Sequence, residues 1–394
     1  MSVLKTYDHM KKEKSFAVVL LTGFLLLGNF QLVCGQGTMD WTNRCFQVVA
    51  PASVCAAVSD ELGLLAIGFH GPAETQLAVY KLDGTGTPVL PPVQIALPCA
   101  EALKSSTNYA LSVAFHPKLP LLYVWQDLAG PALDASTNNP AYAQFDHLLI
   151  YAINNGQLQL IQRHACGVQY ACGKSIGSIA LDPAGKRIFL PNLRDLSSDD
   201  TKCGPGYFTL DTTGMPQVFE EKVTPTYVDM SGFRSLMTGR GIYVVTDTVA
   251  IVSGVYGLAT WDTENRRAVL DLFLLTPGPT EYSICGHPRL PVVYGVQPAG
   301  ATALRMEHAD GYLTMLPQTV GQPGATFQSL PVVMAGKTQR LVVGGPHCLY
   351  ALPLDADGKF TGTPETFEIN SSAVLALAYS MKYDRLYAGV EKAP

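Results

Sequence analysis

Three side chains are the candidates for acid–base chemistry in this sequence: His70, Glu281 and His347. An imidazole takes up a proton near neutral pH, and a carboxylate can act as a general base. Such a set could activate water for attack on a carbonyl carbon. Because His70 and His347 each come after a short apolar run, we expect both to lie where a second strand ends. The chemistry therefore depends on a fold that brings these strand ends together.

Polar residues suited to ligand binding lie in two long segments between apolar runs, Gln126–Asp146 and Pro191–Gly206. Loops of this length are uncommon without a role of their own. The binding candidates in them are Asn138, Tyr142, Arg194 and Asp195. We expect these segments to form a surface for a small molecule, a carbohydrate or a protein. The alternative is that both are variable surface insertions.

The cysteines give a second, structural candidate site. Cys203 lies in one of the long segments, and Cys166 and Cys172 precede it, so a bridge from Cys203 to one of them would hold that segment in place. The alternative for Cys285 and Cys348, which lie in apolar runs, is that they are buried free thiols. No Cys/His cluster has zinc spacing, and no glycine-rich phosphate loop is present, so we expect neither a metal nor a cofactor.

The first 35 residues have the pattern of a secretory signal peptide. Lysines at 11, 12 and 14 precede the apolar run Phe16–Leu27, and Val33 and Gly35 suit a cleavage site before Gln36. We therefore expect a signal peptide over 1–35, a mature domain over 36–394, and a periplasmic or secreted location. The alternative is an uncleaved anchor, which would be the chain's one contact with a membrane.

The composition excludes several classes of protein. Hydrophobic residues make up 47% of the 394 residues and charged residues only 15%, which is atypical of a disordered chain. The net charge is −5 and no basic run is present, so nucleic acid is not an expected partner. The 36 glycines and 27 prolines are spread along the chain, which favours many turns between short strands.

One pattern, in which an apolar run meets a tight turn and a second apolar run follows, recurs along the chain. The clearest copies contain the turns His116-Pro117 and His287-Pro288. The seven copies lie at 57–68, 114–124, 180–190, 233–244, 285–295, 333–344 and 378–388. We interpret His116 and His287 as structural residues of these turns.

A second turn signal runs in phase with the first. The dipeptides are Asp83-Gly84, Asn155-Gly156, Thr213-Gly214, Asp310-Gly311 and Asp357-Gly358. They are typical of hairpin turns that need φ > 0. Two hairpins per unit of about 50 residues predict an all-β fold, a seven-bladed β-propeller with four-stranded antiparallel blades. We expect the apolar run Cys45–Ala50 to close the ring as an outer strand of the last blade.

The repeat resembles the lactonase-type propeller family, which includes bacterial 6-phosphogluconolactonases and YVTN-repeat proteins. The residues that carry the resemblance are the two His-Pro turns, the segment 182–189 and the tripeptide 193–195. The resemblance covers most of 55–390. It implies the propeller fold and, as a possible activity, the hydrolysis of a sugar lactone.

The sequence departs from this family where the family enzymes carry His-x-His and Arg-His elements. The matching positions are Ser175 and Gly177 in one blade and Tyr282 and Ser283 in another. None of these side chains titrates near neutral pH. Our leading hypothesis from the sequence is therefore an exported, non-catalytic binding scaffold. The alternative is a lactonase-like hydrolase of a sugar lactone or similar ester, with His70, Glu281 and His347 around the central channel.

Overall fold

The structure is a computed structural model, and it describes a defined part of the chain. The described residues are 32–33, 45–49, 53–70, 75–97, 111–126, 147–165, 168–169, 179–195, 203–217, 226–227, 241–246, 249–254, 257–262, 267–271, 283–297, 300–307, 312–321, 331–369 and 373–390. All regular secondary structure in these residues is β-strand, which confirms the all-β prediction for this part of the chain. Within these ranges, no helix is long and apolar enough to span a membrane.

The strands of the first half of the chain form three sheets. Sheet 1 contains β3 (Ser53–Ser59), β4 (Leu64–His70), β5 (Thr75–Leu82) and β6 (Pro88–Ala96). Sheet 2 contains β7 (Leu111–Phe115), β8 (Leu121–Gln126), β9 (His147–Asn154) and β10 (Gln157–Ala165). Sheet 3 contains β11 (Val168–Gln169), β12 (Ala180–Leu181), β13 (Arg187–Asp195), β14 (Cys203–Thr209) and β15 (Thr226–Tyr227).

The second half forms three more sheets and contributes to a fourth. Sheet 4 contains β16 (Ile242–Val244), β17 (Val249–Gly254), β18 (Gly257–Asp262) and β19 (Arg267–Asp271). Sheet 5 contains β20 (Ser283–Gly286), β21 (Val292–Gln297), β22 (Gly300–Glu307) and β23 (Tyr312–Gly321). Sheet 6 contains β24 (Val332–Ala335), β25 (Arg340–Gly344), β26 (Cys348–Pro353) and β27 (Glu365–Glu368). Sheet 7 contains β28 (Val374–Ser380), β29 (Arg385–Val390), β2 (Cys45–Val49) and β1 (Leu32–Val33).

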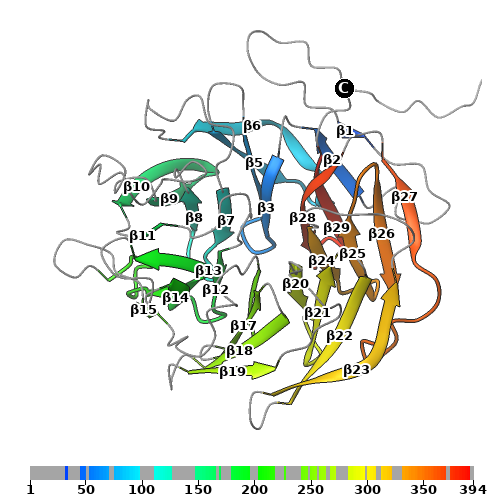
Figure 1. Ribbon diagram of the computed structural model, residues 1–394. Helices are drawn as coiled ribbons and strands as arrows, with labels where there is room; N and C mark the ends of the chain where they lie inside the picture. The colour runs from blue at the N-terminus through cyan, green and yellow to red at the C-terminus, as the bar shows by residue number, and fades with distance from the viewer. Residues whose placement is uncertain are drawn as a thin grey trace, which may run out of the picture.

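The sheets are arranged around a common centre (Figure 1). The strands nearest this centre, which we call the inner strands, are β3, β7, β12, β16, β20, β24 and β28. Each inner strand contacts the inner strand of the next sheet, and β28 contacts β3. Each sheet is apolar on both faces. It buries both of them because it packs against one neighbouring sheet on each side.

The hydrophobic core lies between adjacent sheets. Along β5, Leu77 and Val79 pack toward sheet 2, whereas Ala78 and Tyr80 pack toward sheet 7. This alternation follows from the period of two in a β-strand, which sends successive side chains to opposite faces. A strand that is buried on both faces has apolar residues at consecutive positions. Such continuous apolar runs are the pattern from which these strands are predicted.

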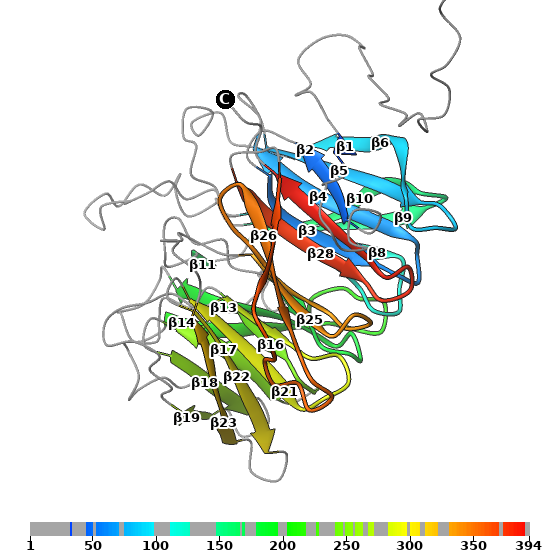
Figure 2. The same ribbon diagram turned by 90° about the vertical axis from the view of Figure 1, so that its right-hand side faces the viewer.

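Sheet 7 combines strands from distant parts of the sequence (Figure 2). The N-terminal β2 pairs with β29, with Cys45 opposite Leu386 and Val49 opposite Val390. The sequence places this N-terminal strand at the outer edge of the last sheet. In the structure β2 instead lies third, parallel to β29, and β1 lies outside it.

The His-Pro turns join neighbouring sheets through a buried imidazole. The Nδ1 atom of His116 accepts hydrogen bonds from the backbone N–H groups of Lys118 (3.0 Å) and Leu119 (2.9 Å), and its Nε2 lies 3.1 Å from the carbonyl oxygen of Gly185 in sheet 3. His287 holds its own turn in the same way, through Arg289 (3.1 Å) and Leu290 (2.9 Å). These contacts confirm the interpretation of both histidines as structural turn residues.

The turns after the third strands use an aspartate instead. Asp83 Oδ1 accepts hydrogen bonds from the backbone N–H groups of Thr85 (2.7 Å) and Thr87 (2.9 Å). Asp211 and Asp355 make the equivalent contacts two and four residues further along the chain. In the first of these turns the residue with positive φ is Gly86 (φ 80°), not Gly84 as the Asp-Gly pattern suggests, because the turn extends two residues further.

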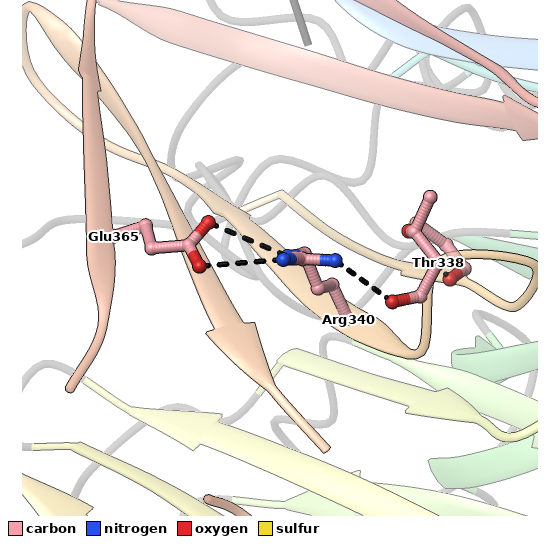
Figure 3. A network of polar contacts seen from close by, with 4 residues as sticks. Thr338, Arg340 and Glu365 are labelled. Atoms are coloured by element: carbon pink, nitrogen blue, oxygen red, sulfur yellow. Dashed lines mark hydrogen bonds and ion pairs between the residues drawn. The ribbon is translucent and has the colours of Figure 1, made fainter. Parts of the chain in front are cut away.

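An ion pair between two side chains contacts β27, the outermost strand of sheet 6 (Figure 3). The Arg340 guanidinium on β25 reaches across β26 to Glu365 on β27, with Nη2 3.3 Å from Oε1, and Nη1 donates to the carbonyl oxygen of Thr338 (2.9 Å). Both side chains are partly exposed, so we assign this ion pair a modest role in keeping β27 in register.

Tyrosines on second strands connect adjacent sheets. The hydroxyl groups of Tyr123, Tyr294 and Tyr387 donate to the carbonyl oxygens of Gly214, Gly358 and Gly86, at 2.7, 3.0 and 2.8 Å. Each acceptor lies in an Asp-containing turn of the next sheet. We call these three contacts the tyrosine links.

We expect Tyr294→Phe to lower the free energy of unfolding by about 1–3 kcal/mol, because the buried carbonyl of Gly358 then has no donor. Tyr80→Phe is a matched control: Tyr80 is equally buried, but its hydroxyl has no hydrogen-bond partner among the described residues. Denaturant unfolding of both variants checks the prediction. Equal destabilisation by the two substitutions would show that the tyrosine link contributes nothing.

Candidate functional site

The inner strands, which face the common centre, carry no acid–base residue. Their described sequences contain no Asp, Glu, His, Lys or Arg. Their polar residues are serines and tyrosines, and their thiols are Cys55 and Cys285. A site near the centre must therefore take its titratable groups from strand ends and loops. The absence of charge from these runs is readable in the sequence, but it is not among the features from which the candidate site was predicted.

Two of the three acid–base candidates lie at ends of second strands. His70 is the last residue of β4 and pairs with Thr75 of β5. His347 is exposed at the β25–β26 turn, with φ 58°, and its carbonyl oxygen accepts a hydrogen bond from the N–H of Ile369 (2.8 Å). Each second strand begins at the turn that joins it to the inner strand, which is the type of turn that contains His116-Pro117 and His287-Pro288. The second strands therefore end at the opposite end of the sheets. Both histidines are one strand removed from the inner strand of their sheet. The third candidate, Glu281, lies outside the described residues.

Arg194 and Asp195 belong to a strand and not to a loop. β13 continues to Asp195, and Arg194 pairs with Cys203 of β14 on one side and with Gln169 of β11 on the other. The predicted loop Pro191–Gly206 is therefore wrong in extent, and only 196–202 separates the two strands. The register shifts between Leu190 and Leu193, so the hairpin bypasses Pro191, which has no N–H to donate.

The remaining predicted ligand-binding and disulfide residues are placed only in part. Asn138, Tyr142, Cys166 and Cys172 lie outside the described residues. Cys203 is the first residue of β14. Because β13 lies between β14 and β11, Cys203 is two strands away from the segment that joins Cys166 to Cys172. A bridge from Cys203 to either of them remains a prediction.

The thiols that the structure describes favour the free-thiol alternative. Cys55, Cys285 and Cys348 are not in disulfides, and Cys348 is buried as the sequence suggests, whereas Cys285 is only half-buried. Burial raises the pKa of the Cys55 thiol to about 12 and also raises the pKa of Cys285. A thiol that does not ionise near neutral pH is a poor nucleophile and a poor metal ligand. In the part of the chain that the structure describes, no group of His, Cys, Asp and Glu could hold a metal ion.

Comparison with known proteins gives the fold a context. No known protein family matches the sequence, and no curated protein is similar to it. The periplasmic gluconolactonase PpgL of Pseudomonas aeruginosa is similar in structure, with a TM-score of 0.58 at 14% identity over 89% of this chain and 95% of that chain.

Two further solved structures extend the similarity. A putative 6-phosphogluconolactonase of Bacteroides fragilis gives a TM-score of 0.53 at 12% identity, over 82% of this chain and 86% of that chain. Raptor of Chaetomium thermophilum gives 0.54 at 10% identity, over 84% of this chain but only 26% of that chain. At these identities the likeness shows the fold alone. The chain has a β-propeller fold of the kind found in lactonases.

Proposed function

We propose that this protein is an extracytoplasmic β-propeller that hydrolyses a sugar lactone or a similar cyclic ester. The observation that carries the proposal is the likeness to propellers named as lactonases, one of them periplasmic, over most of both chains. We propose in addition that the seven sheets are seven blades and that β2 closes the ring. Residues 1–35, which include β1, would be a signal peptide preceding a mature domain from Gln36, and their removal would leave β2 as the outermost strand of sheet 7. The proposed function is therefore the hydrolase, whereas the leading hypothesis from the sequence is the binding scaffold.

Lactone hydrolysis makes modest demands on the protein. A general base takes a proton from water, the water oxygen attacks the carbonyl carbon, and the ring C–O bond breaks to give a hydroxy acid. We propose His70, Glu281 and His347 as the groups that accept and return this proton. Arg194, Asp195, Asn138 and Tyr142 would orient the hydroxyl groups of the sugar. No metal or cofactor is part of this proposal.

A binding scaffold is the second candidate, and it rests on a specific observation. Ser175, Gly177, Tyr282 and Ser283 stand where the family enzymes carry titratable residues. The fold is also similar to part of Raptor, which is not named as a lactonase, so the fold does not decide the activity. The partner would then be a small molecule, a carbohydrate or a protein at the end of the sheets that carries His70 and His347.

We expect the chain from Gln36 to hydrolyse at least one member of a panel of five- and six-membered sugar lactones faster than buffer alone. His70→Gln and His347→Gln should each lower kcat/KM by roughly 10²-fold, because a general base contributes about 10²–10⁴ in rate. Lys118→Gln, an exposed change in a His-Pro turn at the opposite end, is the matched control and should leave the rate unchanged. Acid release at constant pH measures all four proteins.

Two results would contradict this proposal. A folded sample with no turnover on the panel would leave the scaffold as the better reading. Turnover that survives both histidine substitutions would keep the hydrolase but remove these residues from its mechanism.

A further inference from the structure

The exposed aliphatic side chains of the described residues are concentrated in one place. In this part of the chain, the large hydrophobic residues that are exposed are Val89 (48%), Leu90 (38%), Leu160 (43%) and Ile161 (40%). All four lie on the outermost strands of two neighbouring sheets, β6 of sheet 1 and β10 of sheet 2. We call these four side chains the aliphatic patch. A group of exposed apolar residues on a soluble domain marks a contact with a partner or a membrane.

The strand register brings the two halves of the patch to the same space between sheets 1 and 2. Val89 lies opposite Lys81, which by the alternation of β5 is on the face of sheet 1 toward sheet 2. Leu160 lies opposite Tyr151, which packs in the core cluster between the same two sheets. A Cβ on Gly156, in the turn before β10, would lie 2.0 Å from Cε of Lys81, so the two sheets meet here. Val89 and Leu160 therefore belong to one surface.

A β-bulge adds a further apolar side chain to each half of the patch. On β10 the pairing with β9 skips Ile161, and on β6 the pairing with β5 skips residues 90–92, which include Leu90. Bulges re-aim side chains and occur at functional edges of sheets. None of the four patch residues belongs to a hydrophobic core cluster of the described residues. The core therefore does not require these positions to be apolar.

The charges on the strands of the patch are positive. β6 and β10 contain no Asp or Glu. Lys81 and Arg163 are exposed, and Arg163 lies opposite Leu149, whose side chain belongs to the core between sheets 1 and 2. The neighbouring acid is Asp83, and hydrogen bonds from its own turn occupy its carboxylate. The patch is therefore apolar with two basic side chains beside it.

More cations lie at the end of the sheets where β6 and β10 begin. The turns that join an inner strand to its second strand lie at this end, and five of them carry an exposed basic residue: Lys118, Lys186, Arg289, Lys337 and Lys382. None of the five forms an ion pair with a described residue. In the described part of these turns, Glu61 is the one exposed acid. This positive end contrasts with the net charge of the chain, which is −5.

We infer that the aliphatic patch, with Lys81 and Arg163 beside it, docks on the surface of an anionic lipid bilayer. Aliphatic side chains enter the boundary between headgroups and acyl chains, while basic side chains are attracted to the negative headgroups. Four half-exposed side chains present far less than the ~800 Å² per partner of a standard protein interface, which favours a bilayer over a protein. The sequence analysis expects membrane contact only through residues 1–35, whereas this surface lies on sheets 1 and 2.

The test places an environment-sensitive fluorophore in the patch of the full chain. Ile161→Cys is labelled with nitrobenzoxadiazole, and the parent treated in the same way corrects for native thiols. With vesicles of equal parts phosphatidylcholine and phosphatidylglycerol, we expect the emission to rise and to shift to the blue, because the label leaves water. Thr366→Cys is the matched control, since Thr366 is exposed on β27, the outermost strand of sheet 6, and its label should not respond. Should Ile161→Cys fail to fold, Leu160→Cys carries the label.

Two substitutions in the labelled protein test the apolar and the charged parts separately. We expect Leu90→Gln to weaken vesicle binding by about fivefold, because part of an aliphatic side chain no longer leaves water. Lys81→Gln should also weaken it by about fivefold, since a basic residue near an anionic surface contributes about 1 kcal/mol. The effect of Lys81→Gln should nearly vanish in about 0.5 M salt, which screens exposed charges. Lys359→Gln, in the equivalent turn of sheet 6, is the control and should leave binding unchanged.

Three results would overturn the proposal. The first is unchanged emission of the label at 161 with anionic vesicles, or an equal response to vesicles of phosphatidylcholine alone. The second is an equal response of the label at 366, which would show that binding occurs without the patch, as through residues 1–35. The third is a blue shift that appears without vesicles and grows with protein concentration, which would assign the patch to a second copy of the chain.

Discussion

Gly286→Ala is expected to lower the free energy of unfolding by about 3 kcal/mol or more, although it adds a single methyl group. A Cβ at this position would lie 1.8 Å from Cζ of Tyr243, so either the Tyr243 ring must leave its place or the inner strands β16 and β20 must move apart. Tyr243 is half-buried, so displacing its ring also costs the contacts that it makes here. Urea unfolding followed by circular dichroism measures the effect.

Gly84→Ala is the control for this substitution. A Cβ at Gly84 would meet nothing within 4 Å, and the residue does not have a positive φ, so we expect a change within about 0.5 kcal/mol. Tyr243→Leu should recover part of the stability lost in Gly286→Ala. If Gly286→Ala proves as mild as Gly84→Ala, the two sheets do not approach as closely as the structure places them.

Acid is expected to destabilise the fold through His116 and His287 before it affects any carboxylate. Burial lowers the pKa of both imidazoles below the ordinary value of 6.5. Their Nδ1 atoms must stay unprotonated to accept two backbone hydrogen bonds each. The unfolded chain therefore binds more protons than the folded chain below pH 6.5, and stability falls as the pH falls from there.

We expect this acid effect to reach about 2 kcal/mol for the two histidines together between pH 7 and pH 5. The double variant His116→Asn/His287→Asn should be nearly flat over this interval, because an amide oxygen accepts the same bonds and does not titrate. Hydrogen bonds from the turns lower the pKa of Asp83 and Asp211, so their contribution is lost only below about pH 3.8. His347→Asn, at an exposed turn with positive φ, serves as the control. The assignment would be refuted if the stability of the parent did not depend on pH over this interval. It would also be refuted if the stability of the double variant fell with pH as steeply as that of the parent.

The sequence predicts the repeating part of this fold well because the same local interactions recur in each unit. The pattern around His116-Pro117 and His287-Pro288 is readable because one imidazole satisfies two backbone donors of its own turn. The apolar runs are readable because both faces of each sheet are buried. The Asp-Gly pattern finds the hairpins but misplaces the left-handed residue of the first one at Gly84.

The candidate site was less predictable for a physical reason. Loop length was inferred from the spacing between apolar runs, and β13 continues through the polar residues Arg194 and Asp195 because strand pairing depends on main-chain groups. The position and direction of β2 depend on a partner strand far along the sequence, which no local pattern reveals. Whether His70, Glu281 and His347 come together likewise depends on the course of loops, which local sequence does not determine.

The pairing of β2 with β29 also has a consequence that we expect in the kinetics of folding. Inner strands from β3 to β28 can associate with a neighbour that is close in sequence, so six of the sheets involve mostly local contacts. The pairing of Cys45 with Leu386 instead closes a loop of more than 300 residues, with the largest loss of chain entropy among the strand pairings that the structure describes. Long-range pairing of this kind slows folding. Sheet 7 is therefore the part of the fold that we expect to form last and to open first.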